Sequence, residues 1–155
     1  MIPTKLWHNA SLRNNSKVKT MSSPKKFTHT VRVYIEDTDA AGIVYYPNHL
    51  KFFERGRTEL LREYGFTKTT LEADYDLRFV IKSTSIEYKA PAFMDDLLEV
   101  RTVLEKHTPT RLIFNQEIYR SQILIASGKM TVVCVNNTYK PAPLPPVLLG
   151  KLIGL

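Results

Sequence analysis

The stretch YIEDTDAAGIVYYPNHLKFFERGRTELLREYG, residues 34–65, decides how this chain folds. It opens with an apolar strand pattern that ends in two carboxylates, Asp37 and Asp39, which lie two residues apart. A turn of small residues follows, and from Pro47 to Tyr64 the pattern becomes that of an amphipathic helix. The chain therefore passes from a strand to a helix at the point where it places two acids.

The predicted helix has clear boundary signals at both ends. Pro47 suits the first helical position because its missing N–H is not needed there, and Gly65 suits the position just beyond the last turn. Gly56, in the middle, costs the helix about 1 kcal/mol relative to Ala, so we expect a close approach to a sheet there. Apolar residues gather near one predicted face: Leu50, Phe53, Leu60, Leu61 and Tyr64.

Alternating side chains predict five strands around this helix. The first covers residues 27–36, where Val31, Val33 and Ile35 share one face. The other four follow the helix and have short connections, which favour antiparallel neighbours: residues 79–91, 95–107, 110–120 and 123–136.

These elements predict an α+β fold in which a curved, five-stranded antiparallel sheet wraps around one long central helix. A chain of 155 residues fits one domain, which we assign to residues 27–155. Residues 66–78 are predicted to form a loop or a short helical segment, and Ser127–Gly128 a bulge or bend. A helix of about 18 residues, roughly 27 Å long, cannot cover a whole sheet, so we expect an edge strand to pair with a second copy.

Residues 1–26 differ in composition from the rest of the chain. The formal net charge is +7, and this stretch holds six basic residues and no acid, so the remainder is nearly neutral. We expect a flexible basic extension, or an upstream start codon with Met21 as the true start. A transit peptide is a further interpretation, although the stretch has a single Arg and no clear amphipathic face. The near-neutral body disfavours a nucleic-acid partner.

Cys134 is the single cysteine of the chain, which excludes an internal disulfide. Its position in the apolar run MTVVCVN predicts a small core residue rather than a nucleophile. A chain with one cysteine and no internal disulfide is typical of a reducing, cytoplasmic compartment. No apolar run approaches the ~18 residues that a membrane-spanning helix needs, so we expect no transmembrane segment.

The two acids admit a structural and a chemical interpretation. Aspartate is favoured in turns and at helix starts, so Asp37 and Asp39 could act only as turn and capping residues. Alternatively, unpaired backbone N–H groups at a helix start can hold a developing oxyanion while a nearby carboxylate attacks a carbonyl or activates water. That arrangement suits hydrolysis of an activated acyl group and needs no metal ion or other cofactor. Spacing alone leaves both interpretations open.

Other catalytic arrangements are disfavoured. Asp37, Asp39 and His49 lack a recognisable metal-ligand spacing. The chain contains neither a G-x-S-x-G motif nor a glycine-rich phosphate loop. We expect His49, in the first helical turn, to face solvent.

The segment VRVYIEDTDAAGIVYYPNHLKFFERGRTELLREYG closely resembles the signature of the hotdog-fold acyl-CoA thioesterases of the YbgC and 4-hydroxybenzoyl-CoA thioesterase type. The resemblance continues through FVIKSTSIEYKAPAFMDDLLEV (79–100) and MTVVCVNNTYKPAPLP (130–145), and it covers roughly residues 29–146. It implies the same fold as the one inferred above and thioester hydrolase activity. It also implies a homodimer or homotetramer with the active site near the subunit interface.

The resemblance implies roles for individual residues as well. Asp39, the second acid of the D-x-D element, takes the position of the catalytic carboxylate. The backbone N–H of Tyr46 takes the position of the group that polarises the thioester carbonyl, and Asp37 is expected to hold the turn. Substrate contacts are expected from three residues of the turn and helix start: Gly42, Tyr45 and Asn48.

Two positions depart from the YbgC branch, which often has His where this chain has Tyr46 and Tyr where it has Ile35. The YYPN run is more similar to the hydroxybenzoyl-CoA enzymes. The expected substrate is a short-chain or aromatic acyl thioester of coenzyme A, or of acyl carrier protein. Two other functions stay open. One is a hotdog hydratase or dehydratase, for which only His49 is a candidate base. The other is a non-enzymatic protein that binds acyl-CoA or tethers a partner through residues 1–26.

Overall fold

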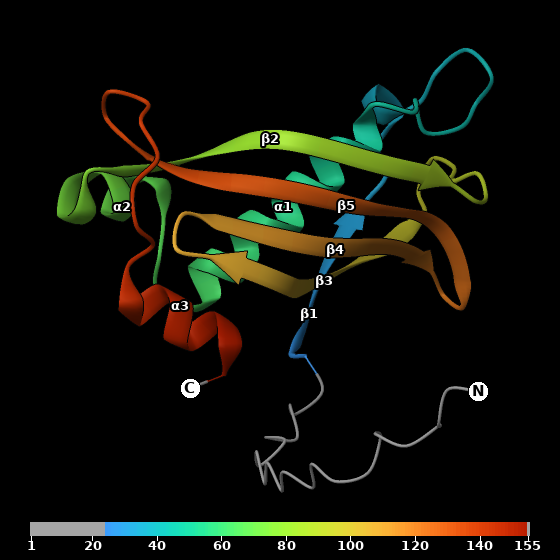
Figure 1. Ribbon diagram of the computed structural model, residues 1–155. Helices are drawn as coiled ribbons and strands as arrows, with labels where there is room; N and C mark the ends of the chain where they lie inside the picture. Colours follow the sequence, from blue (N-terminus) through green and yellow to red (C-terminus); the bar gives the residue numbers. More distant parts are fainter. Residues whose placement is uncertain (1–23, 155) are drawn as a thin grey trace, which may run out of the picture.

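The computed structural model describes residues 24–154, and the expectations for residues 1–23 lie outside this range (Figure 1). The described part has five strands and four helices in the following order: β1 (Lys26–Arg32), the 3-10 helix η1 (Ile35–Asp37), α1 (Asn48–Glu63), α2 (Lys68–Tyr75), β2 (Leu77–Tyr88), β3 (Leu97–Thr108), β4 (Arg111–Arg120), β5 (Ile123–Asn136) and α3 (Pro146–Ile153). The long helix and the last four strands fall close to their predicted bounds. The α+β fold with one long helix against a five-stranded antiparallel sheet is confirmed.

The strands are ordered β1-β3-β4-β5-β2, and every neighbouring pair is antiparallel. The prediction of antiparallel neighbours is therefore confirmed for β3, β4 and β5, but wrong for β2 and β3, because β2 pairs with β5. The connection from β2 to β3 runs along the loop before α1: the Val44 N–H donates to the Ala92 carbonyl at 2.8 Å, and Ile43 forms a bridge with Phe93. β2 therefore has β5 as its single neighbour in the sheet and is an edge strand.

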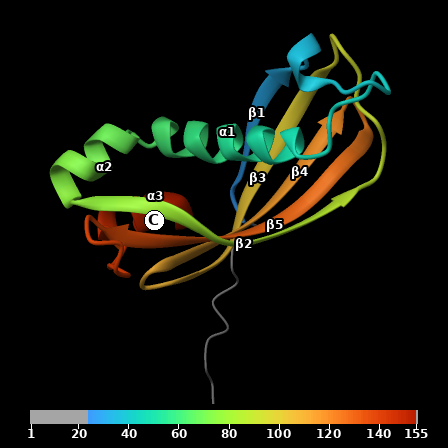
Figure 2. The ribbon, with the colours of Figure 1, turned by 90° about the horizontal axis from the view of Figure 1, so that it is seen from above.

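The long helix α1 lies along the concave side of the sheet (Figure 2). At Gly56 a Cβ atom would lie 2.7 Å from the Val100 methyl carbon and 3.2 Å from Nε2 of Gln116. The buried Gln116 amide donates to the Phe53 carbonyl at 2.9 Å and to the Thr102 hydroxyl at 2.8 Å. The predicted close approach at Gly56 is thus confirmed, and a buried polar side chain of the sheet fixes the helix above it.

Two local predictions differ from the structure. The first strand ends at Arg32, and Ile35 is 75% exposed in η1, because the Asp37 carboxylate binds the Tyr34 N–H at 2.8 Å and turns the chain. The bulge predicted at Ser127–Gly128 lies two residues earlier: the pairing of β5 with β4 shifts register between Ala126 and Leu124, which leaves Ile125 without a partner. Gly128 leaves room for the Phe53 ring, which an added Cβ would meet at 2.9 Å.

The buried stripe of α1 also differs from the predicted one. It runs through His49, Phe52, Phe53, Gly56 and Leu60, which follow helical spacing. Leu50, placed on the apolar face by the sequence pattern, is 38% exposed. The stripe is therefore rotated by about one residue at its N-terminal end, and this rotation brings His49 inside.

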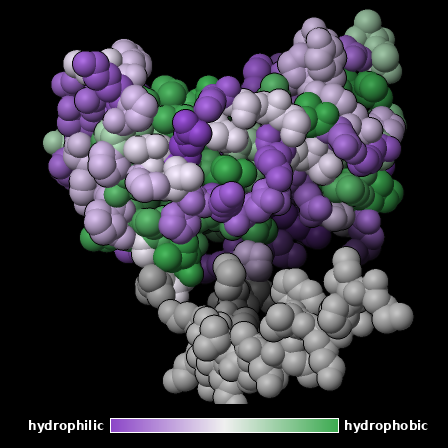
Figure 3. Space-filling model, in the orientation of Figure 1, coloured by the Kyte–Doolittle hydropathy of each residue, from purple (hydrophilic) through white to green (hydrophobic). Residues whose placement is uncertain are grey.

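Two core clusters flank the helix. One lies around Phe52 and Phe53, and the other continues to the C-terminal helix α3, whose Leu148 and Leu152 are buried in it. Cys134 is buried in the second cluster, as predicted, and burial raises its pKa to about 11. On the sheet face turned away from α1, hydrophobic residues are scattered among hydrophilic ones (Figure 3).

We expect Gly56→Ala to lower the free energy of unfolding by about 1–2 kcal/mol, because overpacking against Val100 and Gln116 outweighs the gain in helix propensity. Gly150→Ala is the matched control: it lies within α3 and a Cβ there meets nothing within 4 Å. The free energy of unfolding of this control should rise by about 0.5–1 kcal/mol. Chemical denaturation measures both, and equal stability of the two variants would contradict the close seating of α1.

Candidate active site

The junction between β1 and α1 is held by Asp37. This residue is 5% exposed, and its carboxylate accepts the Tyr34 N–H at 2.8 Å. Its backbone carbonyl accepts two further hydrogen bonds, from the Tyr45 N–H at 2.8 Å and from the Asn48 side-chain amide at 2.9 Å. One residue thus ties together the end of the strand, the loop and the first residue of the helix.

Asp39 lies on the turn that Asp37 anchors. One of its carboxylate oxygens accepts the Ala41 N–H at 2.8 Å, and its backbone carbonyl accepts the Gly42 N–H at 3.0 Å. Gly42 has φ +78°, a left-handed conformation that glycine adopts without strain. Asp39 is exposed in the single chain, and within residues 24–154 its second carboxylate oxygen accepts no hydrogen bond.

The Tyr46 N–H points away from the helix. The carbonyl of the preceding residue, Tyr45, accepts the Asn48 N–H at 2.8 Å and therefore points toward α1. In a trans peptide the N–H lies on the opposite side from the carbonyl. Within residues 24–154 no group accepts a hydrogen bond from the Tyr46 N–H. An unpaired donor at the positive end of the longest helix is suited to bind an anionic oxygen.

His49 is 4% exposed, and the expectation that it faces solvent is wrong. Its Nδ1 lies 3.0 Å from the Tyr46 carbonyl, and its ring meets those of Phe52 and Tyr88 edge-on. Burial lowers the pKa of His49 below its ordinary value of 6.5, while hydrogen bonds to the Tyr46 and Tyr45 backbone oppose this shift. The imidazole is neutral at pH 7 and donates from Nδ1.

Tyr88 is the residue of this junction that the sequence did not reveal. It is the last residue of β2, and its hydroxyl donates to the Tyr46 carbonyl at 3.1 Å. Burial, with a smaller contribution from Tyr46, raises its pKa above the ordinary 10.0, so the phenol keeps its proton at neutral pH. Only the return of β2 along β5 brings it to the helix start, 42 residues away in sequence.

The junction brings together most of the residues singled out from the sequence. Asp39, Gly42, Tyr45 and Tyr46 lie within eight consecutive residues of one loop, and Tyr45 and Tyr46 are both exposed. Asn48 is 6% exposed and its amide is bound to the Asp37 carbonyl, so its observed contact is within the protein. A substrate contact for Asn48 stays a prediction.

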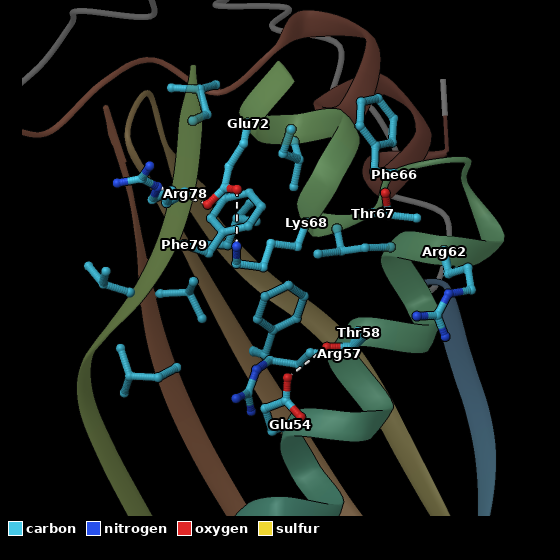
Figure 4. A pocket seen from close by; sticks show the side chains of 18 residues that line it. Glu54, Arg57, Thr58, Arg62, Phe66, Thr67, Lys68, Glu72, Arg78 and Phe79 are labelled. Carbon is cyan, nitrogen blue, oxygen red and sulfur yellow. Dashed lines mark hydrogen bonds and ion pairs between the residues drawn. The ribbon is translucent and has the colours of Figure 1, made fainter. Parts of the chain in front are cut away.

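A cavity of about 390 Å³ lies toward the other end of α1, between this helix, α2 and β2 (Figure 4). Its wall is largely apolar, and charged side chains surround it. Glu72 is paired with Lys68 at 3.0 Å and with Arg78 at 2.9 Å. The Arg57 guanidinium donates to Oε1 of Gln116 at 2.7 Å, and burial lowers its pKa. Asp39 and Tyr46 do not line this cavity. Within one chain, the Asp39 carboxylate and the Tyr46 N–H therefore lie apart from this cavity, which is large enough for an acyl group.

Residues 33–152 match the family model described as the thioesterase-like superfamily. The chain belongs to this family. An acyl-CoA thioesterase YbgC of Haemophilus influenzae is 41% identical over 120 residues, which cover 77% of this chain and 88% of that protein.

Solved structures agree with this assignment. A probable thioesterase of Bartonella henselae has a TM-score of 0.76 and 34% identity, and the match covers 78% of this chain and all of that one. A 1,4-dihydroxy-2-naphthoyl-CoA thioesterase of Synechocystis has a TM-score of 0.78 and 26% identity, over 84% of this chain and 98% of that one. The thioesterase-like chain thus has the hotdog fold that the sequence resemblance implied.

In the described part of this thioesterase-like chain, no helix is long and apolar enough to cross a membrane.

The buried His49 predicts a pH dependence of stability. Its pKa is lower in the folded than in the unfolded chain, so the unfolded chain binds the proton first as the pH falls, and stability falls with it. We expect the midpoint of thermal unfolding to drop between about pH 7 and about pH 5, and to drop less in His49→Asn. His107→Asn, at an exposed histidine, is the control and should follow the wild type. Equal pH dependence in all three proteins would contradict a buried, neutral His49.

Proposed function

We propose that this protein is a thioester hydrolase that cleaves acyl-CoA, with Asp39 as its catalytic carboxylate and the Tyr46 N–H as its oxyanion donor. The unpaired Tyr46 N–H, on the same loop as an exposed carboxylate with one open oxygen, is the observation that carries the proposal. The family and the acyl-CoA activity named for the Haemophilus influenzae relative support it. Short-chain and aromatic acyl groups are the proposed substrates, carried by coenzyme A or by acyl carrier protein; the Synechocystis structure is named for an aromatic one.

The reaction follows from the two groups. The thioester oxygen accepts the Tyr46 N–H, which stabilises the negative charge that develops as the carbonyl carbon is attacked. Asp39 either attacks this carbon itself or removes a proton from the water that does. The carbon–sulfur bond then breaks, the thiol leaves with a proton, and water supplies the oxygen of the carboxylic acid product. Gly42, which has no side chain, leaves room for the acyl group, and the exposed Tyr45 and the neighbouring Asn48 contact the substrate.

A second copy completes the site in this proposal. The edge strand β2 is exposed from Ile81 to Ser85, and an unpaired strand edge favours pairing with another strand. A two-fold antiparallel pairing of β2 with itself, centred on Ser83, puts Tyr88 of one copy opposite the partner's Arg78. Residues 77–81 of β2 line the cavity. The cavity of each copy would then adjoin Asp39 of the other, and the dimer would hold two equivalent sites.

We expect Asp39→Asn to lower turnover by at least about 100-fold, because it removes the ionised carboxylate but not its shape. Release of free thiol from acetyl-CoA, hexanoyl-CoA and benzoyl-CoA measures this. Asp74→Asn, at an exposed acid on α2, is the matched control and should behave like wild type. Tyr46→Phe should keep most of the activity, since it leaves the backbone N–H in place. Wild-type turnover in Asp39→Asn would refute the assignment, and a collapse in Tyr46→Phe would show that the phenol takes part.

Mixing two inactive variants tests the shared site. Thr58 lines the cavity and is half-exposed, so Thr58→Trp should fill the cavity without disturbing the core. Co-expression of Thr58→Trp with Asp39→Asn should restore about a quarter of wild-type turnover, because half of the dimers are mixed and each carries one intact site. Each variant alone, measured at the same concentration, is the control. A mixture as inactive as its parents would contradict a site built from two copies.

A further inference from the structure

The carbonyl of Tyr46 accepts two side-chain hydrogen bonds. One comes from Nδ1 of His49 at 3.0 Å, within the first turn of α1. The other comes from the Tyr88 hydroxyl at 3.1 Å, at the end of β2. A carbonyl oxygen has two lone pairs, so both are used, and the two donors come from different elements of the fold.

His49 is buried, and Tyr88, which is 45% exposed, contacts it through its ring. The Tyr88 ring lies 5.2 Å from the His49 ring and 6.2 Å from the Tyr46 ring, both edge-on, which is a favourable arrangement for aromatic pairs. The His49 ring also meets Phe52, which is fully buried, at 6.3 Å. The core therefore fixes His49, and Tyr88 is oriented by its place at the end of β2 and by its ring contacts with His49 and Tyr46.

We propose that His49 and Tyr88 are positioning residues that aim the Tyr46 N–H at the thioester oxygen. This inference rests on the function proposed above. Tyr46 stands between two peptide planes. The first contains its N–H, and the carbonyl of that plane, from Tyr45, is held by the Asn48 N–H at 2.8 Å. The second plane joins Tyr46 to Pro47 and contains the carbonyl that His49 and Tyr88 bind.

Pro47 makes this second contact necessary. A peptide that ends in proline has no N–H, so its carbonyl is the single backbone group through which the plane can be held by hydrogen bonds. The bonds from His49 and Tyr88 fix one side of Tyr46, and the bond from Asn48 fixes the other. Together they leave the backbone at Tyr46 little freedom to turn its N–H away. An oxyanion donor is effective only if its direction is set before the reaction. The hydrogen bonds from His49 and Tyr88 to the Tyr46 carbonyl, which we call the clamp, therefore give the exposed loop the rigidity that an oxyanion donor needs.

Three variants test the clamp by steady-state kinetics. Tyr88→Phe and His49→Leu each remove one hydrogen-bond donor to the Tyr46 carbonyl and should lower kcat by about tenfold with KM little changed. The reason is that a misdirected Tyr46 N–H would lose part of the rate enhancement of about 10²–10³-fold that one oxyanion donor contributes. His49→Asn keeps an amide donor near the position of Nδ1 and should stay within about threefold of wild type. Tyr75→Phe, at an exposed tyrosine on α2, is the matched control.

Two further readouts separate positioning from stability and from the proposed function. Thermal unfolding should show Tyr88→Phe folded at the assay temperature, so that a loss in kcat is not a loss of folded protein. In ¹H–¹⁵N NMR spectra, both donor-removing variants should shift the Tyr46 amide signal and speed exchange of the Asn48 amide, and Tyr75→Phe should do neither.

The outcomes are distinguishable. Unchanged kcat in both folded donor-removing variants would overturn the clamp, as would a loss in His49→Leu that His49→Asn does not rescue. If the wild type hydrolyses none of the acyl-CoAs, the proposed function fails. The amide signals then decide whether His49 and Tyr88 hold the Tyr46 backbone: unchanged signals overturn this as well, and the predicted shifts support it.

Discussion

The hydrogen bonds to the Asp37 backbone carbonyl are the constraint on which the candidate site depends. Through them the loop N–H of Tyr45 and the buried amide of Asn48 are joined to η1, the short helix that follows the first strand. The Asp37 carboxylate, bound to Tyr34, fixes that segment in turn. Buried polar groups must be paired, so this arrangement has few alternatives. The turn that carries Asp39 and the peptide that carries the Tyr46 N–H therefore have fixed positions relative to the helix.

The two ends of α1 serve different purposes. Its N-terminal end presents an unpaired backbone donor in a positive field, and its C-terminal half forms one wall of the apolar cavity. The contact at Gly56 and Gln116 fixes the helix to the sheet between these ends. One chain cannot bring a helix's start to the cavity beside its own last turns. In the dimer proposed above, pairing across β2 would bring the start of α1 in each chain to the cavity of the other, so the edge strand belongs to the proposed site.

The sequence predicted the long helix α1 and the strands β2 to β5 well because each of them carries a local signal, whereas η1 and α3 were not predicted. Pro47, Gly65 and the alternating strands fixed most boundaries, and the long motif identified the family. Properties set by distant segments were not predictable in this way. The side on which His49 lies depends on how α1 is rotated against the sheet, and Ile35 leaves the strand because a buried carboxylate turns the chain. Tyr88 joins the site only because β2 returns beside β5, and no spacing in the sequence encodes that contact.

The central claim is that the Tyr46 N–H and Asp39 face the two atoms of one thioester carbonyl. A crystal structure of the protein with a non-hydrolysable acyl-CoA analogue, in which a methylene group replaces the thioester sulfur, tests it directly. The account predicts the analogue's carbonyl oxygen about 2.7–3.1 Å from the Tyr46 nitrogen, with the Asp39 carboxylate facing the carbonyl carbon and the acyl group in the partner's cavity. A carbonyl bound elsewhere, with Asp39 directed into solvent, would contradict it.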